Sequence, residues 1–124
     1  MRSGFSLSAI TVDCNDVRAV ASFWSRLFDA DLRESLPGWQ RLGPLTAGGP
    51  VLTFQPVAER KDAKLRLHLD LQVDDLKAAT ALVRRFGGSG VLERHEYQEG
   101  VVIVVADVEG NEFCLVWRRD GSTP

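Results

Sequence analysis

Residues 65–88, LRLHLDLQVDDLKAATALVRRFGG, change their hydrophobic period from two to about 3.6 within one short segment. The first nine residues alternate apolar and polar side chains, which predicts a strand over 65–73 with its leucines on one buried face. The following residues place apolar side chains on one stripe of an amphipathic helix, which we expect to end at Gly87 and Gly88. The segment therefore predicts a strand that leads directly into a helix.

A similar strand and helix pattern occurs 59 residues earlier in the chain. Residues 5–14 alternate like a strand, and the following NDVRAVASFWSRLFDA has a helical stripe of apolar residues. Asn15 and Asp74 are the expected N-caps of the two helices. The same offset of 59 also aligns Phe54 with Phe113, without a gap. An offset that stays constant over this length predicts a duplicated unit.

Three short strands are expected after each helix, separated by turn sequences such as SLPG, LTAGG, QEG and VEGN. They are 31–34, 39–43 and 50–57 in the first half and 91–97, 101–107 and 112–117 in the second. Each half is thus a βαβββ module. We expect one domain over 1–124, with module one over about 5–57, a charged linker over 58–64 and module two over about 65–118.

Composition narrows the class of protein. The chain has 124 residues, 44% of them hydrophobic and 26% charged, which is typical of one globular domain. The net charge is −2, and no basic cluster predicts nucleic-acid binding. No apolar stretch has the length of a signal peptide or membrane span, and Cys14 and Cys114 have no metal or redox spacing. We therefore expect a cytoplasmic, reduced protein without membrane or nucleic-acid partners.

Three segments carry a resemblance to a known family: AITVDCNDVRAVASFWSRLF, LHLDLQVDDLKAATALVRRFGG and DVEGNEFCLV. They resemble the vicinal oxygen chelate superfamily, which has the glyoxalase and bleomycin-resistance fold, over about residues 7–117. The resemblance implies an α+β fold in which two tandem βαβββ modules form a cupped mixed β-sheet with helices on its outer face. Because members of this superfamily have diverse functions, the resemblance says little about any one reaction.

The resemblance also implies where a metal would bind, because metal-dependent members place ligands on the first and last strands of the modules. The matching positions here are Ala9 and His68 on the first strands, and Gln55 and Cys114 on the last strands. Alanine cannot bind a metal and glutamine is a weak ligand, whereas a catalytic zinc ion usually has three protein ligands. We therefore expect no bound metal and no other cofactor.

The polar face of the strand over 65–73 carries His68 and Asp70, which we expect to face the cup. Either Asp70 or Glu112 could add a third metal donor, and His68, Asp70 and His95 imitate a two-histidine, one-carboxylate iron site. Each residue also has a plainer interpretation, which for His68 is a neutral imidazole hydrogen-bonded to a neighbour such as Asp70, Gln55 or water. Cys114 suits a buried apolar position, and Glu112 suits a salt bridge. Trp39 could form a wall of the cup or close a sheet edge.

The mixed apolar and polar character of the expected cup favours a small organic ligand. The residues predicted to bind it are His68, Gln55, Asp70, Trp39, Cys114 and Glu112. The leading hypothesis is a glyoxalase-like binding protein that acts without a catalytic metal. The alternatives are a metal-dependent lyase, isomerase or dioxygenase, and a structural or regulatory module with a filled cup. A homodimer is expected, because a second copy can cover the strand edges of a small sheet.

Overall fold

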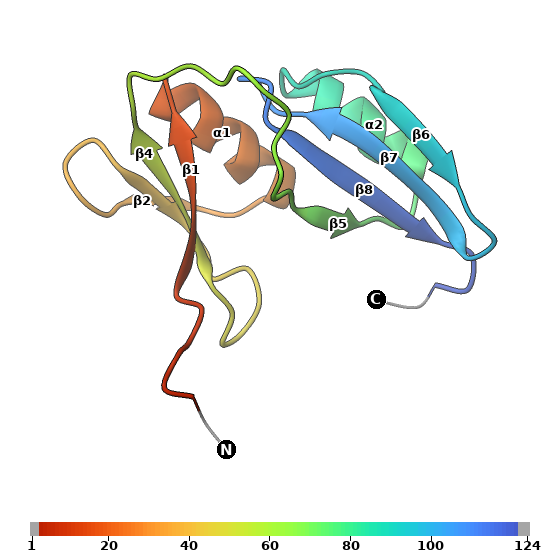
Figure 1. Cartoon of the computed structure of the whole chain (residues 1–124), viewed down its shortest axis with the longest axis horizontal. Coiled ribbons are helices and arrows are strands. Elements are labelled where there is room, and N and C mark those ends of the chain that lie inside the picture. The colour runs from red at the N-terminus through yellow and green to blue at the C-terminus, as the bar shows by residue number, and fades with distance from the viewer. Residues whose placement is uncertain (1–2, 122–124) are drawn as a thin grey trace. The chain divides into compact units, whose positions relative to one another are not determined.

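A computed structural model describes residues 3–121 of the chain (Figure 1). The first half contains β1 (Ala9–Cys14), α1 (Val17–Phe28), β2 (Leu32–Glu34), β3 (Gln40–Leu42) and β4 (Val51–Pro56). The second half contains β5 (Asp70–Gln72), α2 (Leu76–Arg85), β6 (Glu93–Glu96), β7 (Gly100–Ala106) and β8 (Glu112–Arg118). This order confirms the predicted α+β fold of two tandem βαβββ modules. The chain divides into two compact units, Met1–Arg60 and Lys61–Pro124.

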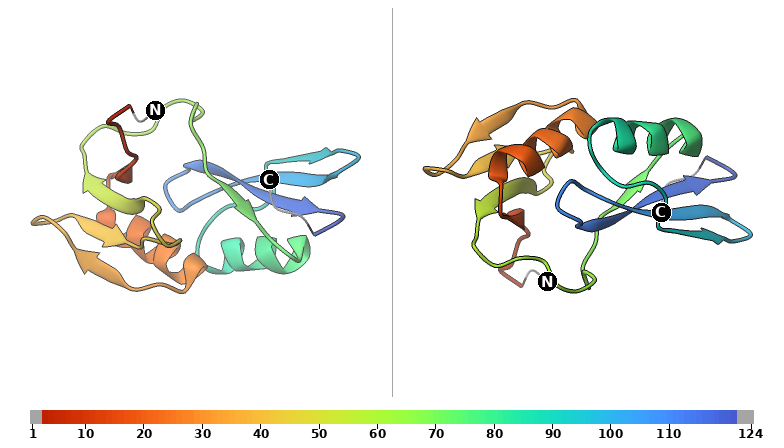
Figure 2. Two further views of the ribbon diagram at one scale, coloured as in Figure 1. Left: turned by 90° about the horizontal axis from the view of Figure 1, so that it is seen from below. Right: turned by 90° about the horizontal axis from the view of Figure 1, so that it is seen from above.

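The first unit is a four-stranded mixed sheet with α1 on one face (Figure 2). Its strand order is β1-β4-β3-β2, in which β1 and β4 are parallel and the other pairs are antiparallel. The helix contributes Val20, Phe23 and Trp24 to the core, and the sheet contributes Leu52 and Phe54, all of them buried. Trp24 is therefore a core residue, as its place on the helical stripe predicts.

The second unit repeats this topology with the strand order β5-β8-β7-β6. β5 is parallel to β8, and β8-β7-β6 is an antiparallel meander. Phe113 and Leu115 of β8, Val105 of β7 and Val83 of α2 are almost completely buried, and α2 contacts β7 and β8. Within the described residues, no helix is both long and apolar enough to cross a membrane.

The two helices begin one residue later than the sequence indicates. The N-caps are Asp16 and Asp75, whose carboxylates accept hydrogen bonds from the backbone N–H groups of Ala19 (3.2 Å) and Ala78 (3.0 Å). The expected caps Asn15 and Asp74 are therefore wrong. A cap side chain satisfies an N–H near the start of the helix that has no partner within the helix.

The strand expected over 65–73 is the largest difference from the sequence prediction, because β5 contains only Asp70–Gln72. At the start of β5, the Cys114 N–H of β8 donates a hydrogen bond of 2.9 Å to the Leu69 carbonyl oxygen. Farther upstream, the Leu65 N–H donates to the Glu112 side chain rather than to the backbone of a neighbouring strand. Leu67 is 91% exposed, so the predicted continuous leucine face against the helix is wrong.

The register between first and last strands also differs between the two units. Thr11 of β1 pairs with Thr53 of β4, 42 residues later, whereas Asp70 of β5 pairs with Cys114 of β8, 44 residues later. The constant offset is therefore wrong for the last strands. By register, the counterpart of Cys114 is Thr53 rather than Gln55. Thr11 and Thr53 form a hydroxyl hydrogen bond of 2.6 Å at the position that Asp70 and Cys114 have in the second unit.

The N-cap assignment makes a direct stability prediction. Replacing Asp75 by alanine should lower the free energy of unfolding by about 1 kcal/mol, because the Ala78 N–H loses its partner. Asp74 provides a matched control, because its replacement by alanine removes the same charge without removing the cap, and should cost less than about 0.5 kcal/mol. Urea unfolding followed by circular dichroism measures both values. An equal loss in the two variants would contradict the assignment.

Candidate functional site

The second sheet has one face that α2 does not cover, here called the open face. Side chains alternate along strands, so residues between those that pack against α2 lie on this face. Cys114 and Val116 of β8 are examples, since they alternate with the core residues Phe113 and Leu115. Following the register outward, the open face consists of Asp70, Gln72, Glu112, Cys114, Val116, Arg118, Gly100, Val102, Val104, Ala106, Glu93 and His95.

Three of the predicted site residues meet beside β5 on the open face. The Nδ1 atom of His68 lies 3.1 Å from Oδ1 of Asp70 and 3.7 Å from Sγ of Cys114. The donor atoms of all three side chains lie within 4.8 Å of one another. The parallel pairing of β5 and β8 creates this cluster, because it places Asp70 opposite Cys114. The cluster is half open to solvent, since the His68 side chain is 41% exposed while Cys114 is buried.

Asp70 determines how the protons in the cluster are arranged. An ionised carboxylate accepts hydrogen bonds and cannot donate them. The His68 ring therefore donates to Asp70 through Nδ1–H. A neutral imidazole with Nδ1 protonated has Nε2 as an acceptor. Within residues 3–121 no hydrogen bond or ion pair involves Nε2 of His68, and the ring is partly exposed. The cluster therefore offers a fixed imidazole acceptor to an incoming molecule.

Cys114 is a protonated thiol in this environment. Burial raises the pKa of Cys114 to about 11, and the negative charge of Asp70 and a hydrogen bond to its carboxylate act in the same direction. Glu93 raises the pKa further, while Lys64 opposes the shift. Because the thiolate is the reactive form of cysteine, the residue is a poor nucleophile at neutral pH. A buried, weakly polar role for Cys114 fits the plainer of its two interpretations.

The cluster also bears on the question of a metal. Imidazole, carboxylate and thiolate are the donor types that zinc uses, and three of them can leave a fourth position open for water or substrate. Asp70 therefore supplies the third donor that the four mapped positions lack. The residues fit a zinc-like ion by type and proximity, provided that the Cys114 proton is displaced. A metal bound there would supply Lewis-acid chemistry, whereas His68 and Asp70 alone supply hydrogen bonds.

Glu112 belongs to a separate set of interactions. Its carboxylate lies 3.1 Å from Nζ of Lys61 and accepts a hydrogen bond of 3.2 Å from the Leu65 N–H. Burial tends to raise the pKa of Glu112, but these bonds outweigh it and hold the pKa below its ordinary value. Lys64 adds an ion pair of 3.7 Å with Glu93. Glu112 therefore fastens residues 61–65 to the open face, which is the salt-bridge interpretation.

The other candidates do not join the cluster within the second unit. Gln55 of β4 and Trp39, in the turn before β3, both belong to the first unit, and both are half-buried. The backbone N–H of Trp39 donates to the Leu36 carbonyl oxygen and closes that turn. His95 pairs with Glu93 at 3.1 Å and is not part of the donor group, so the iron-type constellation with His95 is not formed.

Two cavities lie at the end of the second sheet that includes the β6–β7 turn. One, of about 270 Å³, is lined by Tyr97, Glu99, Gly100, Val101, Val102, Val116, Trp117 and Arg118. Gly100 is required there, because a side chain at this position would collide with the Trp117 carbonyl oxygen of the adjacent strand. Val102, Val116 and Arg118 bring this cavity onto the same face as the His68 cluster.

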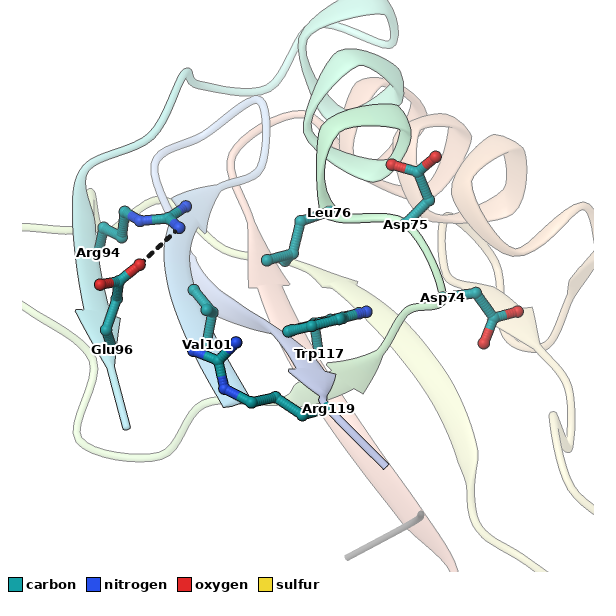
Figure 3. A pocket seen from close by; sticks show the side chains of 8 residues that line it. All are labelled: Asp74, Asp75, Leu76, Arg94, Glu96, Val101, Trp117 and Arg119. Atoms are coloured by element: carbon teal, nitrogen blue, oxygen red, sulfur yellow. Dashed lines mark hydrogen bonds and ion pairs between the residues drawn. The ribbon is translucent and has the colours of Figure 1, made fainter. Parts of the chain in front are cut away.

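The second cavity, of about 370 Å³, lies beside the start of α2 (Figure 3). Figure 3 shows Leu76, Val101 and Trp117 around it, with two aspartates on one side and the Arg94–Glu96 ion pair on the other. It contains none of the predicted site residues. The Trp-Arg-Arg sequence at the end of the last strand, which contributes Trp117, Arg118 and Arg119 to the two cavities, was the signal that sequence reasoning did not use.

Comparison with known proteins places the chain in a family. The model of the glyoxalase-like domain family matches residues 9–116, and the chain belongs to this family. A comparison with curated proteins found no match. The family and the fold together confirm the resemblance to the vicinal oxygen chelate superfamily.

Solved structures with the same fold include several functional classes. A glyoxalase/bleomycin resistance protein/dioxygenase family enzyme from Burkholderia phytofirmans PsJN has a TM-score of 0.75 and 17% identity, over 92% of this chain and 99% of that one. The fosfomycin resistance protein FosX from Listeria monocytogenes has a TM-score of 0.68 and 20% identity, over 94% of both chains. Lactoylglutathione lyase from Agrobacterium tumefaciens has a TM-score of 0.65 and 14% identity, over 96% of this chain and 98% of that one. At these identities, the similarity shows the fold alone.

The Cys114 environment predicts slow thiol chemistry. In a Cys14→Ala background, alkylation by iodoacetamide at pH 8 should be about a hundredfold slower than for a thiol with a pKa of 9.0, because two pKa units reduce the thiolate fraction by that factor. Asp70→Asn should lower the pKa and accelerate the reaction. Because the pKa of Cys114 is raised in the folded state, its contribution to the free energy of unfolding is retained below pH 9. It is lost as the pH rises toward 11. A wild-type rate equal to that of a free thiol would contradict this description.

Proposed function

We propose that the chain binds a small organic molecule on the open face of the second sheet, without a catalytic metal. The His68 imidazole is the main polar contact, and Asp70 is a positioning residue that holds the ring through the 3.1 Å hydrogen bond. This oriented, partly exposed imidazole is the observation that carries the proposal. Val102 and Val116, together with the nearby cavity of about 270 Å³, provide apolar contact of the kind expected in a ligand site.

The chemistry of the cluster supports binding more directly than covalent catalysis. A thiol with a pKa of about 11 is not an activated nucleophile. His68 and Asp70 can accept or donate hydrogen bonds to a ligand, and these contacts orient it. Gln55 and Trp39 belong to the first unit, and their contribution to ligand binding stays a prediction. The charged ends of residues 61–65, fixed by Glu112 and Glu93, would limit the site on one side.

A metal-dependent lyase, isomerase or dioxygenase is the second candidate. The observation that favours it is the group of imidazole, carboxylate and thiol donors within 4.8 Å. The deprotonation that such a site requires at Cys114 opposes metal binding, since the thiol pKa is raised. The metal-free proposal therefore requires that removing the Cys114 proton costs more free energy than coordination of a metal returns.

Metal content and ligand binding together test the proposal. Protein purified without chelator should contain far less than one equivalent of transition metal by elemental analysis. Nuclear magnetic resonance screening with small organic fragments should shift the amide signals of Cys114 and Val116. A His68→Ala variant should keep the fold and bind the best fragment less tightly by about 0.5–1.5 kcal/mol, the contribution of one neutral hydrogen bond.

Two results would decide against this proposal. Near one equivalent of metal per chain that is lost in His68→Ala would favour the second candidate. Fragment binding confined to the cavity beside α2, with no effect of His68→Ala, would place the ligand on the opposite face of the sheet. An Asp74→Ala variant, which changes only the lining of that cavity, is the matched control.

We also propose that the protein is a cytoplasmic homodimer. Support comes from the sheet topology, since β1 and β2 end one four-stranded sheet and β5 and β6 end the other. Such edges have unpaired backbone groups that a second copy can cover. Light scattering at micromolar concentration should give twice the chain mass of 13.7 kDa. A single species at 13.7 kDa would reject the dimer without affecting ligand binding within one module.

A further inference from the structure

Arg118 is the last residue of β8 and lies on the open face, four residues beyond Cys114. Its Nε–H group is buried, and among the described residues it is the buried side-chain N or O atom that lacks a hydrogen-bond partner. None of the ion pairs found in residues 3–121 involves this guanidinium. Arginine is always charged, so the chain holds a cation with an unsatisfied donor at this position.

An unsatisfied donor of this kind lowers stability, because desolvation of the N–H is not compensated by a hydrogen bond. Arg118 also lines the cavity of about 270 Å³, so an external acceptor has room to approach it. Glu99 lines the same cavity but forms no ion pair with Arg118 within 4.0 Å. The two observations are independent: the unpaired N–H indicates a missing hydrogen-bond acceptor, and the cavity gives an acceptor room beside the Arg118 guanidinium.

From these observations we propose that the ligand carries a carboxylate, which the Arg118 guanidinium binds at the cavity. The planar guanidinium presents two parallel N–H groups that match a carboxylate. One cation beside the acidic Glu99 favours a monoanion over a doubly charged phosphate or phosphonate. The proposal rests on the proposed function and adds the chemical class of the ligand.

The geometry of β8 also limits the size of the molecule. Cys114 and Arg118 are four residues apart on one strand, which corresponds to about 13 Å. Val116 lies between them, and Val102 is its partner on β7. An aromatic or aliphatic body can therefore lie over these valines with its carboxylate toward Arg118 and its other end toward His68. The inferred ligand is an apolar monocarboxylate. A donor group at its far end gives a hydrogen bond to the Nε2 atom of His68.

Three related probes test the charge requirement: 2-naphthoate, 2-naphthamide and 2-naphthylphosphonate. Each is titrated into the full-length ¹⁵N-labelled protein, and the Arg118 Nε–H signal is followed by nuclear magnetic resonance. The naphthoate should shift this signal and bind at least about tenfold more tightly than the neutral amide, because hydrogen bonds between charged groups are the stronger ones. The phosphonate should bind less tightly than the carboxylate.

Variants separate Arg118 from its surroundings. Arg118→Gln should reduce naphthoate affinity by about tenfold or more and leave naphthamide affinity unchanged. Arg118→Lys keeps the charge without the planar pair of donors, so its affinity should be intermediate. Arg119→Gln is the matched control, because it removes the same charge from the adjacent residue. Arg119 lies over the ring of Trp117, and its replacement should have little effect on naphthoate affinity.

Three outcomes of these titrations would overturn the inference. If naphthoate and naphthamide bind equally near Val102 and Val116 and the Arg118 signal does not move, the carboxylate is rejected while the proposed function remains. Tighter binding of the phosphonate would reject the choice of a monoanion. If none of the probes changes the spectrum at millimolar concentration, both the carboxylate and the binding site on the open face are rejected.

Discussion

The parallel pairing of β5 with β8 is the constraint on which the candidate site depends. It places Asp70 opposite Cys114 and brings the preceding His68 to within 3.1 Å of the Asp70 carboxylate. A register shifted by one residue would turn these side chains to the helix-covered face, because strand residues alternate. The same β8 strand carries Val116 and Arg118 along the open face. One strand therefore carries residues of both the polar cluster and the anion-binding subsite that we infer.

The cluster combines properties that favour binding over nucleophilic chemistry. Asp70 accepts a hydrogen bond from His68 Nδ1–H and also raises the thiol pKa of Cys114, so one carboxylate orients an imidazole and keeps a cysteine neutral. The same three donors could hold a zinc-like ion only if the thiol lost its proton. Metal binding requires Cys114 to lose its proton, whereas its raised pKa favours keeping it. This balance distinguishes the two functional candidates more sharply than the fold does.

Hydrophobic periodicity predicts most of the fold, since it depends on burial of alternating or helical stripes within each module. The strands 50–57 and 112–117 agree closely with β4 and β8, and both helices are present. It fails for residues 65–69, where leucines alternate but the Leu65 N–H bonds to a carboxylate and Leu67 is exposed. It also aligns Gln55 with Cys114 as equivalent positions of the two modules, because a two-residue change in register leaves the alternation unchanged. Arg118 could not be singled out, since an unsatisfied N–H is visible only in three dimensions.

The protonation state of His68 is the measurement that tests the central claim most directly. Long-range ¹H–¹⁵N correlation spectra distinguish a ring protonated at Nδ1 from one protonated at Nε2. We predict the Nδ1–H form in the wild-type protein at neutral pH, with loss of that preference in Asp70→Asn. A wild-type ring protonated at Nε2, unaffected by the Asp70 substitution, would contradict the claim that Asp70 orients His68 for ligand binding.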